Sequence, residues 1–278
     1  MIRIVADTST LYSTAQAREA GFDVSPLSVT INSQSYREFD EISAEEFVDI
    51  IRQGHLPVSS QPAIGEVAAL YEKYKEDEII NIALADGLSG TYRSAVAAAE
   101  LAESPERITV VNTRTLCGPH RYMVETAVRM AQENATVEEI CKMLQEKMDT
   151  AKSFLVPADF DYLRRGGRLS PLVSYVGQAA GLMPIMTQTE DGCRLAVASI
   201  RRGFNHTLKF IEKALQKHGV GAGWRVYITH AAAPQLAQKA VETLRETFPD
   251  CVFEVYPLSP VFITQGGPGC MAVQVIKA

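Results

Sequence analysis

The sequence predicts an α/β protein with two domains, and two observations support this prediction. Short runs of β-branched residues alternate with longer segments of helical periodicity, which is the pattern of a largely parallel sheet covered by helices. The chain has 278 residues, of which 46% are hydrophobic and 22% charged, so it can bury the core that such a fold needs. We expect a Rossmann-like parallel-sheet domain over residues 1–157 and a smaller α/β domain over residues 158–278.

Short runs rich in β-branched residues predict the strands of both halves. In the first half they cover residues 2–6, 79–84, 108–112 and 154–156. In the second half they cover residues 183–188, 193–200, 225–229, 251–256 and 271–276. The dipeptide Asp191-Gly192 between two of these runs is a hairpin signal, so 183–188 and 193–200 should pair as antiparallel strands.

Helix starts are marked by capping residues. Ser43-Ala-Glu-Glu46 and Thr136-Val-Glu-Glu139 are capping boxes, each followed by apolar residues at helical spacing. Pro62 suits a first helical turn because its missing N–H costs nothing there, and a further helix should begin near Gly90. In the second half, helical periodicity predicts helices over residues 205–218 and 234–247.

Composition excludes several classes of protein. With 27 Lys and Arg against 33 Asp and Glu, the net charge of −6 lacks the basic footprint of a nucleic-acid binder. The five cysteines contain no C-x-x-C spacing, which argues against a zinc ribbon or a disulfide framework. No metal-ligating set is evident. The longest mostly apolar stretch, residues 172–186, is shorter than the roughly 20 residues that cross a bilayer. The N-terminus lacks the apolar region of a signal peptide, so we expect a cytoplasmic protein with no membrane span.

Two clusters of small polar residues stand where helices are expected to start. Ser59 and Ser60 precede Pro62, and Ser89 is followed by Gly90 after a predicted strand. Hydroxyls and free backbone N–H groups at a helix N-terminus can hold a carboxylate or phosphate without a cation. The simpler interpretation is that Ser60 and Ser89 are only helix caps.

Five motifs in order give the chain a specific resemblance. They are Ala6-Asp7-Thr8-Ser9, Ser59-Ser60-Gln61-Pro62, Gly87-Leu88-Ser89-Gly90-Thr91-Tyr92, Tyr162-Leu163-Arg164-Arg165-Gly166-Gly167-Arg168-Leu169-Ser170 and Gly267-Pro268-Gly269. With them the chain resembles the DegV family of bacterial fatty-acid-binding proteins over nearly its whole length. The resemblance implies that one long-chain fatty acid lies in a tunnel between the two domains. It also implies that a separate fatty acid kinase phosphorylates the bound acid for phospholipid synthesis, with no cofactor held by this chain.

The hydroxyl clusters and a separate apolar stretch are the expected sites for the two ends of the ligand. The carboxylate is expected at Ser59, Ser60, Ser89, Gly90 and Gln265, and the tail at Leu172, Val176, Leu182, Met183 and Ile185. The apolar stretch that contains the tail residues also includes Val173 and Met186. Its plainer alternative is an ordinary core helix and strand. Burying each methylene contributes about 0.8 kcal/mol before the entropic costs of binding, so the tail should supply most of the affinity and the head group the orientation.

Several residues depart from the family pattern or extend it. Gln265 stands where the family commonly has a histidine, and Asp86 where it usually has a serine. A carboxylate at Asp86 would repel an anionic ligand unless it points away. Arg168, Arg201 and Arg202 are candidates for contact with the head group or with a partner, and their alternative is an exposed surface position.

Two enzymatic alternatives use Ser89 on the same scaffold. A serine hydrolase would need a G-x-S-x-G elbow, which is absent, and a histidine base. No recognisable motif surrounds any of the five histidines, which are His55, His120, His206, His218 and His230. A phosphotransferase would need a glycine-rich phosphate loop after a strand, and neither usual form occurs. We therefore predict a lipid-binding protein that is not an enzyme, with a hydrolase or phosphotransferase as the alternative.

Overall fold

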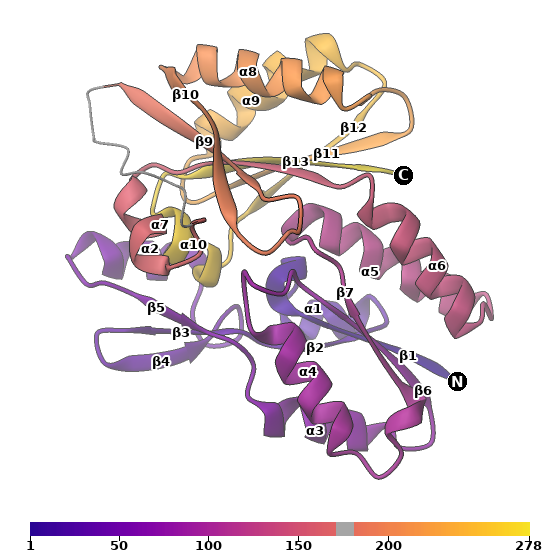
Figure 1. Ribbon diagram of the computed structural model, residues 1–278. Helices are drawn as coiled ribbons and strands as arrows, with labels where there is room; N and C mark the ends of the chain where they lie inside the picture. The colour runs from indigo at the N-terminus through magenta and orange to yellow at the C-terminus, as the bar shows by residue number, and fades with distance from the viewer. Residues whose placement is uncertain (171–180) are drawn as a thin grey trace.

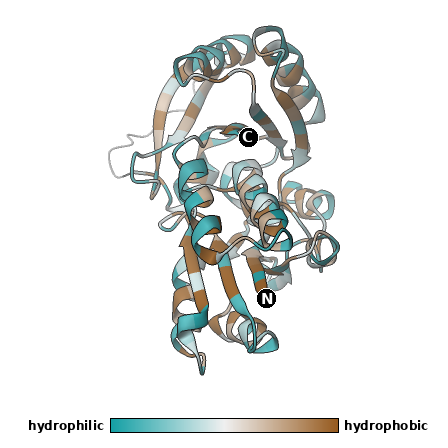
Figure 2. Cartoon of the chain, turned by 90° about the vertical axis from the view of Figure 1, so that its right-hand side faces the viewer, coloured by the Kyte–Doolittle hydropathy of each residue, from teal (hydrophilic) through white to brown (hydrophobic). Residues whose placement is uncertain are grey.

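The computed structural model describes residues 1–170 and 181–278. In the described part, the chain forms two α/β halves that stand one above the other in Figure 1. The first half contains a four-stranded sheet and a small three-stranded sheet, and the second half contains a six-stranded sheet. Figure 2 shows hydrophobic residues concentrated on the strands and hydrophilic residues on much of the outer helical surface, as expected when helices cover buried sheets.

Four parallel strands form the main sheet of the first half, in the order β2-β1-β6-β7. The strands are β1 (Ile2–Asp7), β2 (Asp23–Ser25), β6 (Glu78–Ala83) and β7 (Ile108–Asn112). The accompanying helices are α1 (Thr14–Glu19), α3 (Ile64–Lys73), α4 (Thr91–Glu100), α5 (Cys117–Gln132) and α6 (Val137–Met148), with 3-10 turns η1 (Thr8–Thr10) and η2 (Pro105–Arg107). The predicted Rossmann-like parallel sheet is confirmed. Helix α5 was not predicted, because its N-cap Leu116 offers no capping side chain.

A second, antiparallel sheet corrects the expectation at Ser59 and Ser60. Its strands are β3 (Ser28–Ile31), β4 (Gln34–Arg37) and β5 (Val58–Ser60), and α2 (Ala44–Arg52) begins at the predicted capping box. Ser59 and Ser60 pair with β3, so they lie on a strand and not at a helix start. Helix α3 begins only at Ile64, after an N-cap Ala63 that has no side-chain hydrogen bond. Backbone pairing with β3 outweighs the helix-start signal of Pro62.

The second half is built on a mixed sheet in the order β10-β9-β8-β13-β11-β12. The strands are β8 (Lys152–Val156), β9 (Leu182–Gln188), β10 (Leu195–Arg202), β11 (Trp224–His230), β12 (Val252–Pro257) and β13 (Met271–Lys277). The predicted β9–β10 hairpin is confirmed. Strand β8 pairs with β13 and β9, so a division by sheets falls before Lys152. The proposed boundary after residue 157 stays a prediction.

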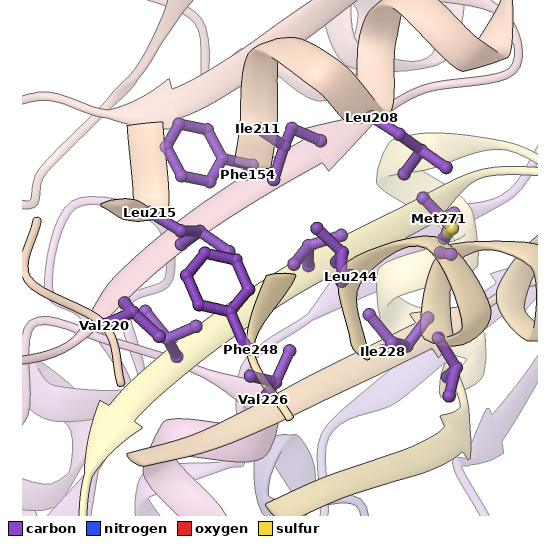
Figure 3. Close-up of a cluster of buried hydrophobic side chains, with 14 of the residues drawn as sticks. Phe154, Leu208, Ile211, Leu215, Val220, Val226, Ile228, Leu244, Phe248 and Met271 are labelled. Carbon is purple, nitrogen blue, oxygen red and sulfur yellow. The ribbon is translucent and has the colours of Figure 1, made fainter. Parts of the chain in front are cut away.

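Helices cover the two faces of this sheet unequally. The long helices α8 (Phe204–Lys217) and α9 (Pro234–Thr247) cover one face, and the short helices α7 (Phe160–Gly166) and α10 (Pro260–Gly266) lie on the side of the first half (Figure 1). Under α8 and α9 a core forms in which Phe154, Ile211, Leu215 and Leu244 meet (Figure 3). The opposite face of the sheet is turned toward the first half. No helix within residues 1–170 or 181–278 combines the length and hydrophobicity that a membrane crossing requires.

A buried carboxylate joins the two halves. Glu38 is fully buried; it accepts hydrogen bonds from the Thr8 hydroxyl and, at 3.0 Å, from the backbone N–H of Val261 at the start of α10. Burial raises the pKa of Glu38 to about 7. The position of α10 therefore depends on a carboxyl group that titrates near neutrality.

The free energy of unfolding should fall as pH rises through the folded-state pKa of Glu38. The pKa of Glu38 is higher in the folded than in the unfolded chain. The contribution of Glu38 to stability is therefore complete at a pH below the unfolded-state pKa and is lost above about pH 7. From about pH 5 to about pH 8 the loss should be roughly 3 kcal/mol. Burial lowers the pKa of His120, which contributes with the opposite sign, so the measured quantity is the difference between wild type and Glu38→Gln in urea unfolding. Parallel pH profiles for the two proteins would contradict the assignment.

Candidate functional site

A mostly apolar cavity lies between the two halves. Its empty volume, open solvent at its mouth included, is about 940 Å³. Its floor is the face of the six-stranded sheet opposite α8 and α9, and its cover comes from the first half and α10. Its apolar lining includes Leu27, Leu84, Leu88, Leu116, Cys117, Leu155, Met186, Leu195, Leu258, Val261, Phe262 and Ala272.

Four predicted head-group residues meet at one part of the cavity wall. Ser59, Ser89, Arg168 and Gln265 all line the cavity, and Ser60 lines it at an exposed position. The side-chain N–H of Gln265 donates to the Ser59 hydroxyl at 3.1 Å. The amide oxygen of Gln265 is buried and has no hydrogen-bond partner in the part of the chain that the structure describes. These residues come from β5, the turn before α4, the segment after α7, and α10, so only the tertiary fold brings them together.

Ser89 belongs to a tight turn at the start of α4. Its hydroxyl lies 2.8 Å from that of Thr91 and accepts the Thr91 backbone N–H at 3.3 Å, so it bonds to the first residue of α4. Gly87 in the same turn has a φ of +88°, and a Cβ there would stand 2.7 Å from the carbonyl oxygen of Cys193. A glycine is needed because the β9–β10 turn packs directly on this backbone. The hairpin of the second half thereby reaches the head-group residues of the first.

Gly90 serves the site indirectly. It is the N-cap of α4 and is absent from the cavity lining, so its contact with the carboxylate stays a prediction. A Cβ on Gly90 would meet the side chain of Gln61 at 1.7 Å. The missing side chain lets Gln61 reach the Ser94 hydroxyl. Gly90 thus leaves room for Gln61, which does line the cavity.

Arg168 supplies the charge of the cavity wall. It is the only charged side chain among the lining residues that the structure describes, and it forms no ion pair with a described carboxylate. Its guanidinium donates to the carbonyl oxygens of Leu88, at 3.0 Å, and of Gly166. Burial, with a smaller contribution from Arg194, lowers the pKa of Arg168 below its usual range. A half-buried cation without a carboxylate partner favours an anionic ligand.

Neither Asp86 nor Cys117 places a negative charge in the cavity. Asp86 is absent from the cavity lining, and its carboxylate accepts from Arg93 at 3.0 Å. It therefore points away from the head-group residues, as an anionic ligand requires.

Cys117 does line the cavity, and burial raises the pKa of its thiol well above the usual value, with Glu38 adding to the shift. The thiol is neutral and acts as part of the apolar wall.

Three of the predicted tail residues, Leu182, Met183 and Ile185, are absent from the cavity lining, which is a correction. Ile185 is fully buried in the core under α8 and α9, and Met183 packs against the same core. Side chains alternate along a strand, so Met186, next to Ile185, faces the cavity instead. Leu182 lies at the start of β9 and is 38% exposed. Leu172 and Val176 lie outside the described residues.

Arg201 and Arg202 are also apart from the cavity. Both are exposed at the end of β10, and neither belongs to the cavity lining. The Arg201 guanidinium lies 4.9 Å from the centre of the Phe210 ring on α8. The described cavity lining therefore gives no support to contact with the head group, and contact of these two residues with a partner stays a prediction.

No arrangement for serine hydrolysis forms at Ser89. In the described ranges its hydroxyl has Thr91 as partner and no histidine. A serine–histidine pair does occur elsewhere: the Ser9 hydroxyl lies 2.6 Å from His120 Nδ1, and His120 Nε2 lies 2.9 Å from the carbonyl oxygen of Ile82. Both residues are completely buried, so this pair cannot meet a substrate. No group of residues suited to hold a metal ion is found within 1–170 and 181–278.

Comparison with known proteins places the chain in a family. The model described as the uncharacterised-protein DegV family matches residues 1–278. A DegV domain-containing protein of Staphylococcus aureus (strain N315) is 29% identical over 280 residues, which cover 99% of this chain and 98% of that one. Another from Caldanaerobacter subterraneus subsp. tengcongensis is 33% identical over 221 residues, 79% of this chain and 78% of the relative.

Solved structures share the whole fold. The crystal structure of DegV, a fatty acid binding protein from Bacillus subtilis, matches with a TM-score of 0.88 and 26% identity, covering 100% of this chain and 99% of the other. That of a DegV lipid binding protein from Thermotoga maritima matches with a TM-score of 0.86 and 28% identity, over 99% and 98% of the two chains.

Fold and cavity together define an α/β protein that encloses an apolar pocket between two halves, with its polar groups gathered at one part of the wall. This chain belongs to the DegV family. The family resemblance carried by the five sequence motifs is thereby confirmed.

Proposed function

We propose that this protein binds a single long-chain fatty acid in the cytoplasm, as a carrier that catalyses no reaction. The carboxylate lies against Arg168, Ser59 or Ser60, Ser89 and Gln265, and the hydrocarbon tail fills the apolar cavity. One observation carries this proposal: a mostly apolar cavity between the halves has Arg168 as its one charged described side chain, without a carboxylate partner. A cation beside a long apolar space matches a ligand with an acidic head and a hydrocarbon tail.

Relatives of known structure support the ligand class. The Bacillus subtilis protein is called a fatty acid binding protein, and a Thermus thermophilus protein with 26% identity and a TM-score of 0.87 is described under fatty acid binding of a DegV family protein. A Thermotoga maritima protein with 28% identity and a TM-score of 0.84 is described as revealing fatty acid binding function. Their fold covers the chain from end to end.

We further propose that the bound acid is presented to a separate fatty acid kinase for phospholipid synthesis. Ser60 and Gln61 line the cavity and are exposed, so a second protein can approach the head-group end while the tail stays buried. Among the described residues, no histidine bonds to Ser89 and no second charged side chain lines the cavity. Phosphoryl transfer therefore requires a partner that binds the nucleotide and its metal.

Native mass spectrometry of the purified chain tests the ligand assignment. We expect a mass increase equal to one long-chain fatty acid, and organic extraction should release that acid for identification. A chain stripped of lipid and offered oleate should take up one equivalent. Protein that carries no acyl chain and takes none up would contradict the proposal, and a bound nucleotide would favour the phosphotransferase alternative.

A further inference from the structure

The sheet face that forms the cavity floor carries two rows of side chains. An apolar row consists of Met186 on β9, Leu155 on β8 and Ala272 on β13, which are paired across the sheet. A polar row consists of Gln188 on β9, Ser153 on β8 and Gln274 on β13, with Ser153 paired to Gln274. All six residues line the cavity.

The polar row is the more distant from the head-group residues. A Cβ on Gly266, next to Gln265, would lie 3.7 Å from the Leu155 side chain, which places the apolar row beside Gln265. Ser153 is two residues farther along β8, and residues on the same face of a strand are about 6.6 Å apart at that spacing. A chain that starts at Gln265 therefore crosses the apolar row before it reaches the polar row.

A second pocket lies on the far side of the polar row. Its empty volume is about 720 Å³, open solvent included, and its lining is largely polar, with Arg114, Lys152 and Glu190 among its members. Ser153, Thr187 and Gln188 line both this pocket and the cavity. The two spaces are therefore separated by a wall that is only one layer of side chains thick.

Gln188 closes this wall through a contact between the halves. Its side-chain N–H donates to the carbonyl oxygen of Arg114 at 2.9 Å, which bridges β9 to the segment that follows β7. The other two members are held to their own sheet: the Thr187 hydroxyl donates to the backbone of Ser153, and Ser153 accepts from Gln274. Of the three shared residues, Gln188 is the one whose side chain spans the gap.

We infer that Gln188 is the end wall for the hydrocarbon tail and sets the longest acyl chain that the cavity accepts. This inference rests on the proposed function. Methylenes that pass the apolar row meet the amide of Gln188, beyond which lies a polar pocket that opens to solvent. A longer chain must push the Gln188 side chain out of its place against Arg114, so binding selects against it.

Competition among acids of different length tests the inference. The stripped protein is offered an equimolar mixture of saturated acids from myristic to behenic acid, and native mass spectrometry measures the bound fractions. Gln188→Ala should raise the ratio of bound behenic to bound palmitic acid about tenfold, because the truncation removes the side chain against which the extra methylenes are overpacked. Gln188→Ser serves the same purpose if the alanine variant folds poorly.

Two matched variants separate volume from other effects. Gln188→Met keeps the bulk of the wall and should retain the wild-type length profile, and so should Gln216→Ala, which alters an exposed glutamine on α8. An unchanged profile in both shortened variants, with the wild type loaded normally, would overturn this inference alone. A wild type that binds no acid of any length would overturn the proposed function and the inference with it.

Discussion

Leu155→Asp should abolish fatty-acid retention, with affinity lower by about a hundredfold or more. Leu155 lies in the middle of the cavity floor, between Met186 and Ala272, and its side chain lines the cavity. A carboxylate at this position would lose its water when the tail enters, and burying an unpaired charge costs several kcal/mol. Displacement of a fluorescent fatty acid by oleate measures the loss.

Leu182→Asp is the matched control for this experiment. It makes the same substitution on the neighbouring strand, at a residue that is 38% exposed and outside the cavity lining. Its affinity should stay within about twofold of the wild type, because the new charge remains in water. Circular dichroism confirms that both variants fold. If Leu155→Asp binds oleate as the control does, the tail does not lie in this cavity.

Arg168→Gln should weaken binding of the acid by about tenfold to a hundredfold. Hydrogen bonds to charged groups contribute about 1.5–3 kcal/mol, and no other described side chain of the cavity wall carries a charge. The corresponding fatty alcohol, which carries no charge, should lose little affinity. The informative quantity is therefore the ratio of the two dissociation constants, measured by the same displacement assay in wild type and variant.

Arg194→Gln controls for general loss of positive charge near the cavity. Arg194 lies beside Arg168, donates to the carbonyl oxygen of Gly167 at 2.9 Å, and is exposed. Its removal should leave the acid-to-alcohol ratio within about twofold of wild type. Equal losses of acid and alcohol in Arg168→Gln would show that Arg168 supports the wall through Leu88 and Gly166 and does not bind the head group.

Local signals in the sequence predicted the fold where short-range interactions decide it. The capping boxes at Ser43 and Thr136 both form, and the Asp191-Gly192 signal lies between the antiparallel strands β9 and β10. Helix α5 and the three-stranded sheet were missed because neither has such a signal. Helix α5 has no capping side chain, and β5 is three residues long, held by pairing with a strand about thirty positions earlier.

For the candidate site as well, some residues could be predicted from the sequence and others could not. Ser59, Ser89, Arg168 and Gln265 were named from motifs, and the fold brings them to one part of the cavity wall. The tail residues were chosen for hydrophobicity alone, which does not distinguish a core from a cavity. Ile185 and Met186 are equally apolar neighbours, yet one packs under α8 and the other faces the ligand space.

The sequence by itself determined the α/β class and the family, and it named four polar residues that line one cavity, because local propensities and motifs are written in consecutive residues. Only the tertiary structure decided which strand face borders the cavity, that Glu38 joins η1 to α10, and that Gln188 bonds across to Arg114. These features depend on pairing and packing between segments far apart in the chain. Such contacts exist only after the chain has folded.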